Sequence, residues 1–307
     1  MDKKAFFTID SGGSKTVLTL YTDGGTFIKE DRARGFGSAE DGDAVLEEAR
    51  QVISAFCEGY KIARGVCNLG GKNKTQMEAT LKAACPHAEV RVFRESEGTV
   101  GLALCEMYSA QVTLMAGTGA IAIAPTGEKT AIVGGWGANI SDRGSGYQLG
   151  LDAVRLALRE LDGTGELSLL TQELTGIKEP PDAMDAADYC AFRDRVRRTL
   201  APLDRAHIAS FARTVYDTAK RGDGQSLALY KTVGLDLATL VITAAQKARV
   251  TLRGVVVNGG MVNGKEFWME GFEEALKTEY GAVRVHYLTN GIDDAMRHMA
   301  KNMTKGE

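Results

Sequence analysis

Three short apolar segments joined by glycine-rich turns occur twice along the chain, and this repetition constrains the fold more than any other feature. The segments are rich in β-branched and aromatic residues and are bounded by turn residues, which predicts strands joined in hairpins. In each copy the third segment leads into alternating helix and strand patterns. The predicted strands are residues 5–10, 16–21 and 26–30 in the first copy and 112–116, 120–124 and 130–133 in the second.

The repetition predicts an α/β protein made of tandem βββαβαβα units, each with a mixed sheet covered by helices. We expect an N-terminal domain at residues 1–108, completed by a C-terminal helix at 290–307. The second domain is expected at 109–289, with a helical insertion at about 164–246. Two such domains predict an interdomain cleft, which is where a ligand is expected.

Composition argues against several classes of function. The formal net charge of −3 disfavours binding to nucleic acid or to a membrane surface, because both need a basic patch. The apolar runs are too short to predict a membrane span. Five cysteines without a CxxC pair and four scattered histidines predict a reducing, cytoplasmic location and no protein-held zinc.

Glycine is enriched, at 36 residues, and its pairs adjoin the predicted strands, which indicates tight turns or a close backbone approach to a ligand. The first such turn is residues 10–16, DSGGSKT. Small residues there allow successive backbone N–H groups to point at one phosphate oxygen, and Asp10 ends a strand in a position to hold Mg²⁺. An ordinary hairpin turn is the alternative interpretation. The candidate phosphate ligands are Gly12, Gly13, Ser14, Lys15 and Thr16.

A second glycine turn, Gly117, Thr118 and Gly119, occupies the same place in the second copy. A dinucleotide-binding GxGxxA motif would run from a strand into a helix, whereas here a strand pattern continues, which predicts a second phosphate-binding hairpin. A later pair, Gly259 and Gly260, follows another predicted strand and would let the backbone lie against a flat adenine. A simple strand–helix turn is the alternative for that pair.

A third glycine-rich segment is residues 134–137, GGWG, followed by Asp142 before a predicted helix. Glycines around Trp136 suit a loop that lines a substrate, with Gly135 and Asp142 as further candidates. Helix capping by Asp142 or Ser145 is the alternative. Capping alone does not account for a tryptophan between glycines.

The order of these motifs, DSGGSKT, then GTG, then GGWG with D-x-GSGY, then a late glycine pair, resembles the BadF/BadG/BcrA/BcrD ATPase family and, within it, the N-acetylglucosamine kinases. The resemblance extends over nearly the whole chain. It implies a two-domain actin-like ATPase (ribonuclease H-like) fold, ATP and Mg²⁺ as cofactors, and transfer of the ATP γ-phosphate to a hydroxyl of a small sugar. It also implies that Gly259 and Gly260 serve the adenosine, and that Trp136 and Asp142 line the sugar or the metal.

Some positions depart from the pattern of the N-acetylglucosamine kinases. Glu95 stands where the resemblance places an aspartate that acts as base, so the carboxylate is carried on an arm one methylene longer. Glu97, two residues further on, is a second candidate. Leu69, before Gly70, stands where a serine would contact the sugar. Because a site that hydrogen-bonds hydroxyls discriminates through those bonds, the resemblance predicts the nucleotide better than the acceptor.

The sequence therefore favours a kinase for N-acetylglucosamine or a related amino sugar, with Glu95 and Asp10 as catalytic residues. An ATPase that drives another protein is a second hypothesis, although the related dehydratase activators hold an iron–sulfur cluster on cysteines that this pattern does not match. A sensor that binds nucleotide or sugar without transfer is a third, motivated by Glu95 and Leu69. The oligomeric state is open, with a homodimer among the candidates.

Overall fold

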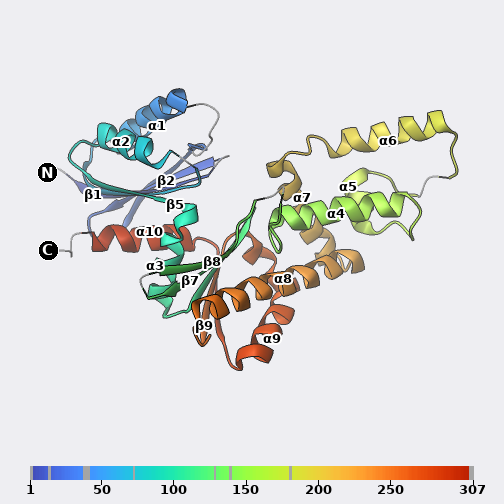
Figure 1. Cartoon of the computed structure of the whole chain (residues 1–307). Coiled ribbons are helices and arrows are strands. Elements are labelled where there is room, and N and C mark those ends of the chain that lie inside the picture. Colours follow the sequence, from blue (N-terminus) through green and yellow to red (C-terminus); the bar gives the residue numbers. More distant parts are fainter. Residues whose placement is uncertain are drawn as a thin grey trace. The chain divides into compact units, whose positions relative to one another are not determined.

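The computed structural model describes residues 3–12, 15–36, 42–71, 73–127, 129–137, 140–179 and 182–303. Gly13 and Ser14, two of the predicted phosphate ligands, lie outside these ranges. The chain divides into two compact units (Figure 1). Unit 1 consists of Met1–Ala110 and Asn290–Glu307, and unit 2 consists of Gln111–Thr289.

Unit 1 is one five-stranded sheet with its covering helices. Its elements are β1 (Lys4–Ser11), β2 (Lys15–Thr22), β3 (Phe27–Arg34), α1 (Gly42–Cys57), β4 (Lys61–Leu69), α2 (Lys74–Ala84), β5 (Glu89–Arg94), the 3-10 helix η1 (Glu95–Glu97), α3 (Thr99–Tyr108) and α10 (Gly291–Asn302). The strand order is β3-β2-β1-β4-β5. Helices α1 and α2 lie on one face, and α10, with α3 beside it, lies on the other (Figure 1). Because β1 is parallel to β4 and β5 follows in parallel, the turn after β1 and the ends of β4 and β5 meet at one edge.

The alternation of side chains along β1 decides which residues are buried against which helices. Phe7 and Ile9 belong to the hydrophobic core shared with α1 and α2. Thr8, which lies between them, points to the other face. There its hydroxyl donates to Oδ1 of Asp293 on α10 at 2.7 Å. The same alternation places Asp10 on the α10 face, at the carboxyl end of the strand.

Unit 2 repeats this topology. Its elements are β6 (Val112–Ala116), β7 (Ala120–Thr126), β8 (Lys129–Gly134), α4 (Gly146–Leu161), α5 (Leu169–Thr175), α6 (Ala186–Leu200), α7 (Arg205–Lys220), α8 (Gly224–Ala248), β9 (Gly254–Asn258), the 3-10 helix η2 (Gly260–Phe267), α9 (Met269–Tyr280) and β10 (Arg284–Leu288). The strand order β10-β9-β6-β7-β8 is that of unit 1 read from the other edge. The predicted tandem α/β architecture is therefore confirmed.

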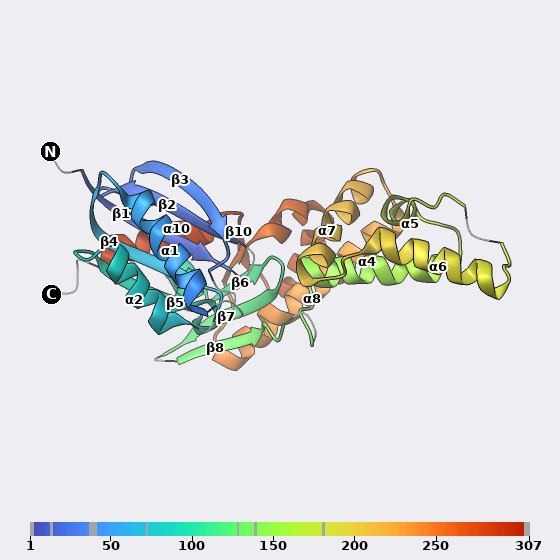
Figure 2. The same cartoon turned by 90° about the horizontal axis from the view of Figure 1, so that it is seen from above.

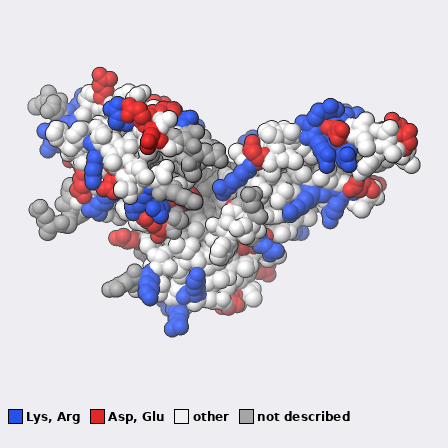
Figure 3. Space-filling model, turned by 45° about the horizontal axis from the view of Figure 1, so that its top comes forward, with Lys and Arg blue, Asp and Glu red and all other residues white. Residues whose placement is uncertain are grey.

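The helices of unit 2 fall into two groups. Helix α8 packs against β6, β7, β8 and α9, so the range predicted as an insertion includes a helix that covers the sheet. Helix α8 is also the one helix in the described ranges that is long and apolar enough to cross a membrane, but Leu237 and Val241 at its centre are fully buried in the core of unit 2. Helices α4 to α7 extend away from the sheet of this unit (Figure 2), and their surface in Figure 3 mixes basic and acidic side chains.

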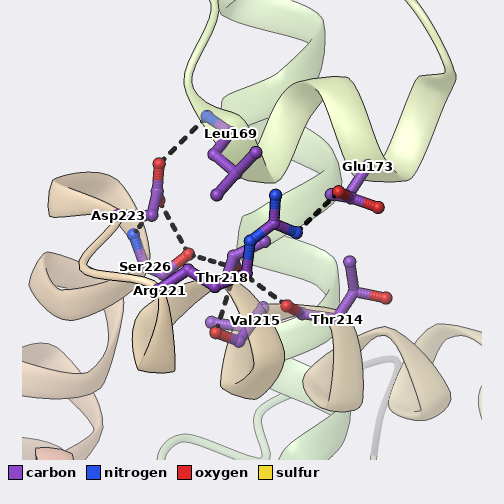
Figure 4. A network of polar contacts seen from close by, with 8 residues as sticks. All are labelled: Leu169, Glu173, Thr214, Val215, Thr218, Arg221, Asp223 and Ser226. Atoms are coloured by element: carbon purple, nitrogen blue, oxygen red, sulfur yellow. Dashed lines mark hydrogen bonds and ion pairs between the residues drawn. The ribbon is translucent and has the colours of Figure 1, made fainter.

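A polar network fixes α7 against α5 and α8 (Figure 4). Asp223 caps α8 by accepting from the backbone N–H and hydroxyl of Ser226, both at 2.8 Å, and its other oxygen accepts from the backbone N–H of Leu169 at 3.0 Å. The hydroxyls of Ser226 and Thr218 are 2.7 Å apart. The carboxyl end of α7 is therefore tied to the starts of two neighbouring helices.

Helices α4 and α7 approach most closely at Gly150, which leads to a first prediction. A methyl group added there would overlap the carbonyl oxygen of Ile208 and lie 2.9 Å from its carbon. We expect Gly150→Ala to push the two helices apart and lower the free energy of unfolding by about 1–3 kcal/mol, measured by chemical denaturation. Gly271→Ala is the matched control, since a methyl on that helical glycine meets no atom of the described residues within 4 Å and should stabilise by about 0.5–1 kcal/mol. Equal stability of Gly150→Ala and the wild type would contradict the close packing.

Candidate active site

Asp10 stands at the end of β1, beside the first glycine turn. It lies in register with Asn68 on the parallel strand β4, and the Asn68 side-chain amide donates to Oδ1 of Asp10 at 2.9 Å. Burial raises the pKa of the Asp10 carboxyl, the nearby charge of Asp293 also raises it, and the Asn68 hydrogen bond and the Lys15 ammonium lower it. A partly buried carboxylate whose charge is incompletely offset favours a cation.

Two buried hydroxyls hold the first hairpin in shape. The hydroxyl oxygens of Ser11 and Thr16 are 2.8 Å apart, and the backbone N–H of Phe36 donates to both, at 3.0 and 3.2 Å. The backbone N–H of Gly12 donates to the carbonyl oxygen of Lys15 at 2.9 Å. The Thr16 hydroxyl, predicted as a phosphate ligand, is fully buried, so its observed contacts shape the turn, whereas Lys15 is exposed.

Glu95 lies next to this first hairpin. It directly follows β5 and begins η1. A methyl group added to Gly70 would lie 3.2 Å from Oε2 of Glu95, 3.3 Å from Cα of Gly12 and 3.4 Å from the carbonyl oxygen of Ser11. The backbone N–H of Gly70 donates to that same oxygen at 2.7 Å. Gly70 therefore separates the candidate base from the first turn, and a side chain at this position would press on both.

Glu97 and Leu69, the predicted residues next to Glu95 and Gly70, are both occupied by contacts within unit 1. The ammonium of Lys74 lies 2.9 and 3.0 Å from the two carboxylate oxygens of Glu97, so Glu97 ties η1 to α2. Glu95 is kept as the candidate base because of its position beside Gly70. Leu69 is 1% exposed and belongs to the core of unit 1. Its side chain packs among apolar residues, so Gly70 is the member of this predicted pair that lies beside the hairpin.

The second glycine turn connects β6 to β7 and rests on the N-terminus of α4. The backbone N–H of Gly117 donates to the carbonyl oxygen of Gly119 at 2.9 Å. The backbone N–H groups of Gly146 and Tyr147 donate to the carbonyl oxygens of Gly117 and Thr118 at 2.8 and 3.3 Å. The hairpin is therefore held against the positive end of a helix, an environment that favours an anion.

The late glycine pair lies beside this second hairpin. Strand β9 pairs with β6, and Gly259 follows it with a φ of 122°. A methyl group on Gly259 would overlap the carbonyl oxygen of Ala116 and lie 3.3 Å from the backbone nitrogen of Gly117. Its backbone N–H donates to the carbonyl oxygen of Leu288 at 3.1 Å. The structure thus brings two of the predicted nucleotide motifs together within unit 2.

Three glycines of these motifs are not required by the protein's own geometry. Gly12, Gly117 and Gly260 are absent from the residues with a left-handed backbone among the described ranges. A methyl group on Gly117 or Gly260 would meet no described atom within 4 Å, and one on Gly12 would only touch a carbonyl oxygen at 3.9 Å. Close approach of a ligand to the backbone would explain glycine at these positions.

The GGWG loop after β8 depends on its glycines for another reason. Gly134, Gly135 and Gly137 have φ values of 82°, 69° and 94°, and residues other than glycine rarely adopt such values. The loop presents Trp136 with 71% of its surface exposed. An exposed aromatic ring on a backbone of this kind can pack against the apolar face of a sugar.

Asp142 is buried beyond this loop. Ser145, and not Asp142, caps α4, because its hydroxyl accepts from the backbone N–H of Gln148 at 3.1 Å. Neither carboxylate oxygen of Asp142 has a hydrogen-bond partner among the described residues, and Nη2 of Arg205 lies 3.6 Å from Oδ2. A buried polar group without partners costs about 1–3 kcal/mol, and such groups concentrate at ligand sites.

Burial raises the pKa of the Asp142 carboxyl. The guanidinium of Arg205 opposes this effect, as do the backbone N–H groups of Gly137 and Ala120, which approach the carboxylate outside hydrogen-bonding geometry. The carboxylate therefore lies in a site that would accept a donor from a ligand.

Three residues of these sites were not singled out from the sequence. Asn68 and Asp293 flank Asp10, and Arg205 faces Asp142. The parallel pairing of β1 with β4 would have indicated Asn68, since it places the two residues side by side. The sequence holds no comparable signal for Arg205, which comes from the start of a helix more than sixty positions away from Asp142.

The chain is similar to known proteins over nearly its whole length. The model of the BadF/BadG/BcrA/BcrD ATPase family matches residues 8–292. An N-acetylmuramic acid/N-acetylglucosamine kinase of Clostridium acetobutylicum is 24% identical over 298 residues, covering 92% of this chain and 93% of the relative. Two crystal structures, of proteins assigned as N-acetylglucosamine kinases, are similar in fold. The one from Chromobacterium violaceum has a TM-score of 0.69 at 19% identity, covering 95% of this chain and 97% of the other. The one from Porphyromonas gingivalis has a TM-score of 0.67 at 17% identity, covering 97% and 99%.

The two repeated α/β units have the fold of these solved structures. Since the family model extends over almost the whole length, the chain belongs to the BadF/BadG/BcrA/BcrD ATPase family. The fold and the family predicted from the order of the glycine motifs are thereby confirmed.

Proposed function

We propose that this protein is an ATP-dependent kinase that transfers the γ-phosphate of ATP to a hydroxyl of N-acetylglucosamine or a related amino sugar. Membership of an ATPase family supports the nucleotide, and the curated relative, which acts on two amino sugars, supports the acceptor class. In keeping with ATP as the donor, the reaction would take place in the cytoplasm. The first hairpin, in unit 1, and the second hairpin, in unit 2, are each proposed as phosphate-binding turns.

The observation that carries the proposal is the position of Glu95. Oε2 of Glu95 and Cα of Gly12 lie 3.2 and 3.3 Å from the position that a methyl group on Gly70 would take. A kinase needs a carboxylate next to its phosphate-binding turn, so that the attacking hydroxyl is oriented and its proton accepted as the phosphoryl group arrives.

The residues around Asp10 fit a magnesium ion. Mg²⁺ is held by one or two carboxylates together with phosphate oxygens, and Asp10 is a partly buried carboxylate whose charge is incompletely offset. When bound, the ion would neutralise charge on the transferred phosphoryl group. Asn68 would keep the Asp10 carboxylate in place through its hydrogen bond. Asp142, also considered as a metal ligand, faces Arg205 and is better suited to accept a hydrogen bond from the sugar.

The remaining groups would position the acceptor. Trp136 would pack on the sugar ring, and Asp142 would accept from a hydroxyl, so that the attacking oxygen is fixed relative to the γ-phosphate. Fixing both reactants in this way supplies most of the rate in phosphoryl transfer, because the protein takes part in little covalent chemistry.

The experiment is ADP release by the purified protein with Mg-ATP and a panel of acceptors: N-acetylglucosamine, N-acetylmuramic acid, glucose and no sugar. We expect release that depends on an amino sugar and exceeds the rate without sugar by at least about 10²-fold. Equal release with and without sugars would overturn the kinase in favour of an ATPase, and sugar or nucleotide binding without any turnover would indicate a sensor.

A further inference from the structure

Arg205 reaches a buried carboxylate from the surface of the protein. Its Nη2 lies 3.6 Å from Oδ2 of Asp142, and its side chain is 57% exposed while that of Asp142 is 1% exposed. Neither carboxylate oxygen has a hydrogen-bond partner among the described residues. The guanidinium therefore forms an ion pair with Asp142 but leaves that group's hydrogen-bonding capacity unused.

The Arg205 guanidinium and the Asp142 carboxylate both lie close to Gly119 of the second glycine hairpin. A methyl group on Gly119 would lie 3.2 Å from Nη2 of Arg205 and 3.2 Å from Oδ2 of Asp142. Gly119 is thus the point at which the hairpin, the buried carboxylate and the exposed cation meet. A ligand bound along this hairpin would encounter the guanidinium and the carboxylate together.

Helix α7 holds the arginine in this place. Arg205 is its first residue, and Asp204 caps the helix by accepting from the backbone N–H of His207 at 2.8 Å. One turn further on, Ile208 is packed against Gly150 of α4, and the far end of α7 is fixed by the network of Figure 4. The guanidinium consequently stands at the positive end of a helix whose position is well determined.

An anion at this hairpin would change the pairing of Arg205. A guanidinium has five N–H donors in a planar fork that matches phosphate and carboxylate oxygens, and only one ion pair in the described part of the chain uses them. The incoming anion would be attracted to Arg205 and repelled by Asp142. If Arg205 turns to the anion, Asp142 is left to accept a hydrogen bond from a neutral hydroxyl.

We propose that Arg205 is a further ligand-binding residue of this site, which binds an anionic group at the second hairpin and thereby releases Asp142 to the acceptor. The inference deepens the proposed kinase function and rests on it. The anion has two sources of the same chemistry: the outer phosphate of the nucleotide, or a carboxylate on the sugar. The binding experiments that follow distinguish them.

The first measurement is calorimetric binding of Mg-ATP and Mg-ADP to Arg205→Met. If Arg205 binds the outer phosphate, the affinity for ATP falls about 10- to 100-fold while that for ADP is nearly unchanged, because a hydrogen-bonded charge is lost only from ATP. Arg213→Met is the matched control, since Arg213 lies on the same helix, forms an exposed pair with Asp217 and lies over the ring of Tyr216. This variant should bind both nucleotides like the wild type.

The second measurement compares N-acetylglucosamine with N-acetylmuramic acid, which carries a carboxylate. If the carboxylate is the anion, Arg205→Met weakens binding of the acidic sugar about 10- to 100-fold and leaves that of the neutral sugar and of ATP unchanged. In either case Arg205→Lys recovers part of the loss, because it restores the charge without the planar fork. Unchanged affinity for ATP and for both sugars in Arg205→Met would overturn the proposal.

The coupling to Asp142 has its own test. If the anion is the outer phosphate, a non-hydrolysable Mg-ATP analogue should raise the affinity of the wild type for N-acetylglucosamine, and in Asp142→Asn this increase should disappear. If the anion is the sugar carboxylate, the wild type should bind N-acetylmuramic acid more tightly than N-acetylglucosamine, and in Asp142→Asn this increase should disappear. An increase of the same size in Asp142→Asn would refute the release of Asp142. Since these readouts are binding constants, a wild type without turnover would refute the kinase and leave the role of Arg205 to be decided by the measured affinities.

Discussion

Replacing Glu95 by glutamine is expected to lower phosphoryl transfer by about 10²- to 10⁴-fold, the usual contribution of a general base, while ATP still binds. The amide keeps the shape of the side chain but cannot accept a proton from the attacking hydroxyl. The distances around Gly70 place the lost carboxylate at the tip of the first hairpin, so the effect should appear in kcat more than in the KM for ATP. Steady-state ADP release and calorimetric ATP binding measure the two parts.

Glu97→Gln is the matched control, because it makes the same change two residues further along η1. Its carboxylate is held by Lys74, so this variant should keep the turnover of the wild type and lose only some stability. Glu95→Asp adds a test of geometry, because retracting the carboxylate by about 1 Å can cost about 10²-fold. Full activity in Glu95→Gln, or a loss of turnover confined to Glu97→Gln, would move the base away from Glu95.

The fold could be predicted from the sequence because its signals are local. Each hairpin is marked by short apolar runs around small turn residues, and the second copy confirms the first. The start of β6 at Val112 and the end of β9 at Asn258 coincide with the predicted limits. Helix α8 shows where local signals fail: its apolar pattern does not reveal that it covers the sheet, since that depends on which strands lie beside it.

The candidate sites could be predicted only in part, for the same reason. The glycine motifs are visible in the chain, but the partners that determine their chemistry come from distant segments. Thr16 has a hydroxyl that could bind phosphate, yet this hydroxyl forms hydrogen bonds with the Ser11 hydroxyl and with the backbone N–H of Phe36. Arg205 belongs to a helix with no recognisable motif and is brought to Asp142 by the packing of α7 on α4.

Asp10→Asn is expected to keep or increase the stability of the protein while it abolishes activity. Burial raises the pKa of Asp10 above its ordinary value, so Asp10 ionises in the unfolded chain at a lower pH than in the folded protein. The free energy of unfolding therefore falls as the pH rises from the unfolded pKa to the folded pKa, and it stays at the lower value above both. Asparagine removes this cost and keeps the oxygen that accepts from Asn68. Without ligand, Asp10→Asn should therefore unfold at an equal or higher temperature than the wild type at neutral pH, and the difference should vanish in acid.

The same change should abolish function, because the lost charge is the one proposed to hold Mg²⁺. A metal ion supplies several kcal/mol of charge stabilisation in the transition state, so we expect turnover with Mg-ATP to fall by about 10³-fold or more. For the wild type, affinity for Mg-ATP should weaken as acid protonates Asp10, and this pH dependence should be absent in the variant. Asp31→Asn, at an exposed position of β3 in the same sheet, should change neither quantity. Normal turnover of Asp10→Asn would contradict a metal site at the end of β1. A lower unfolding temperature than that of the wild type would indicate that the Asp10 carboxylate stabilises the fold and does not serve a ligand.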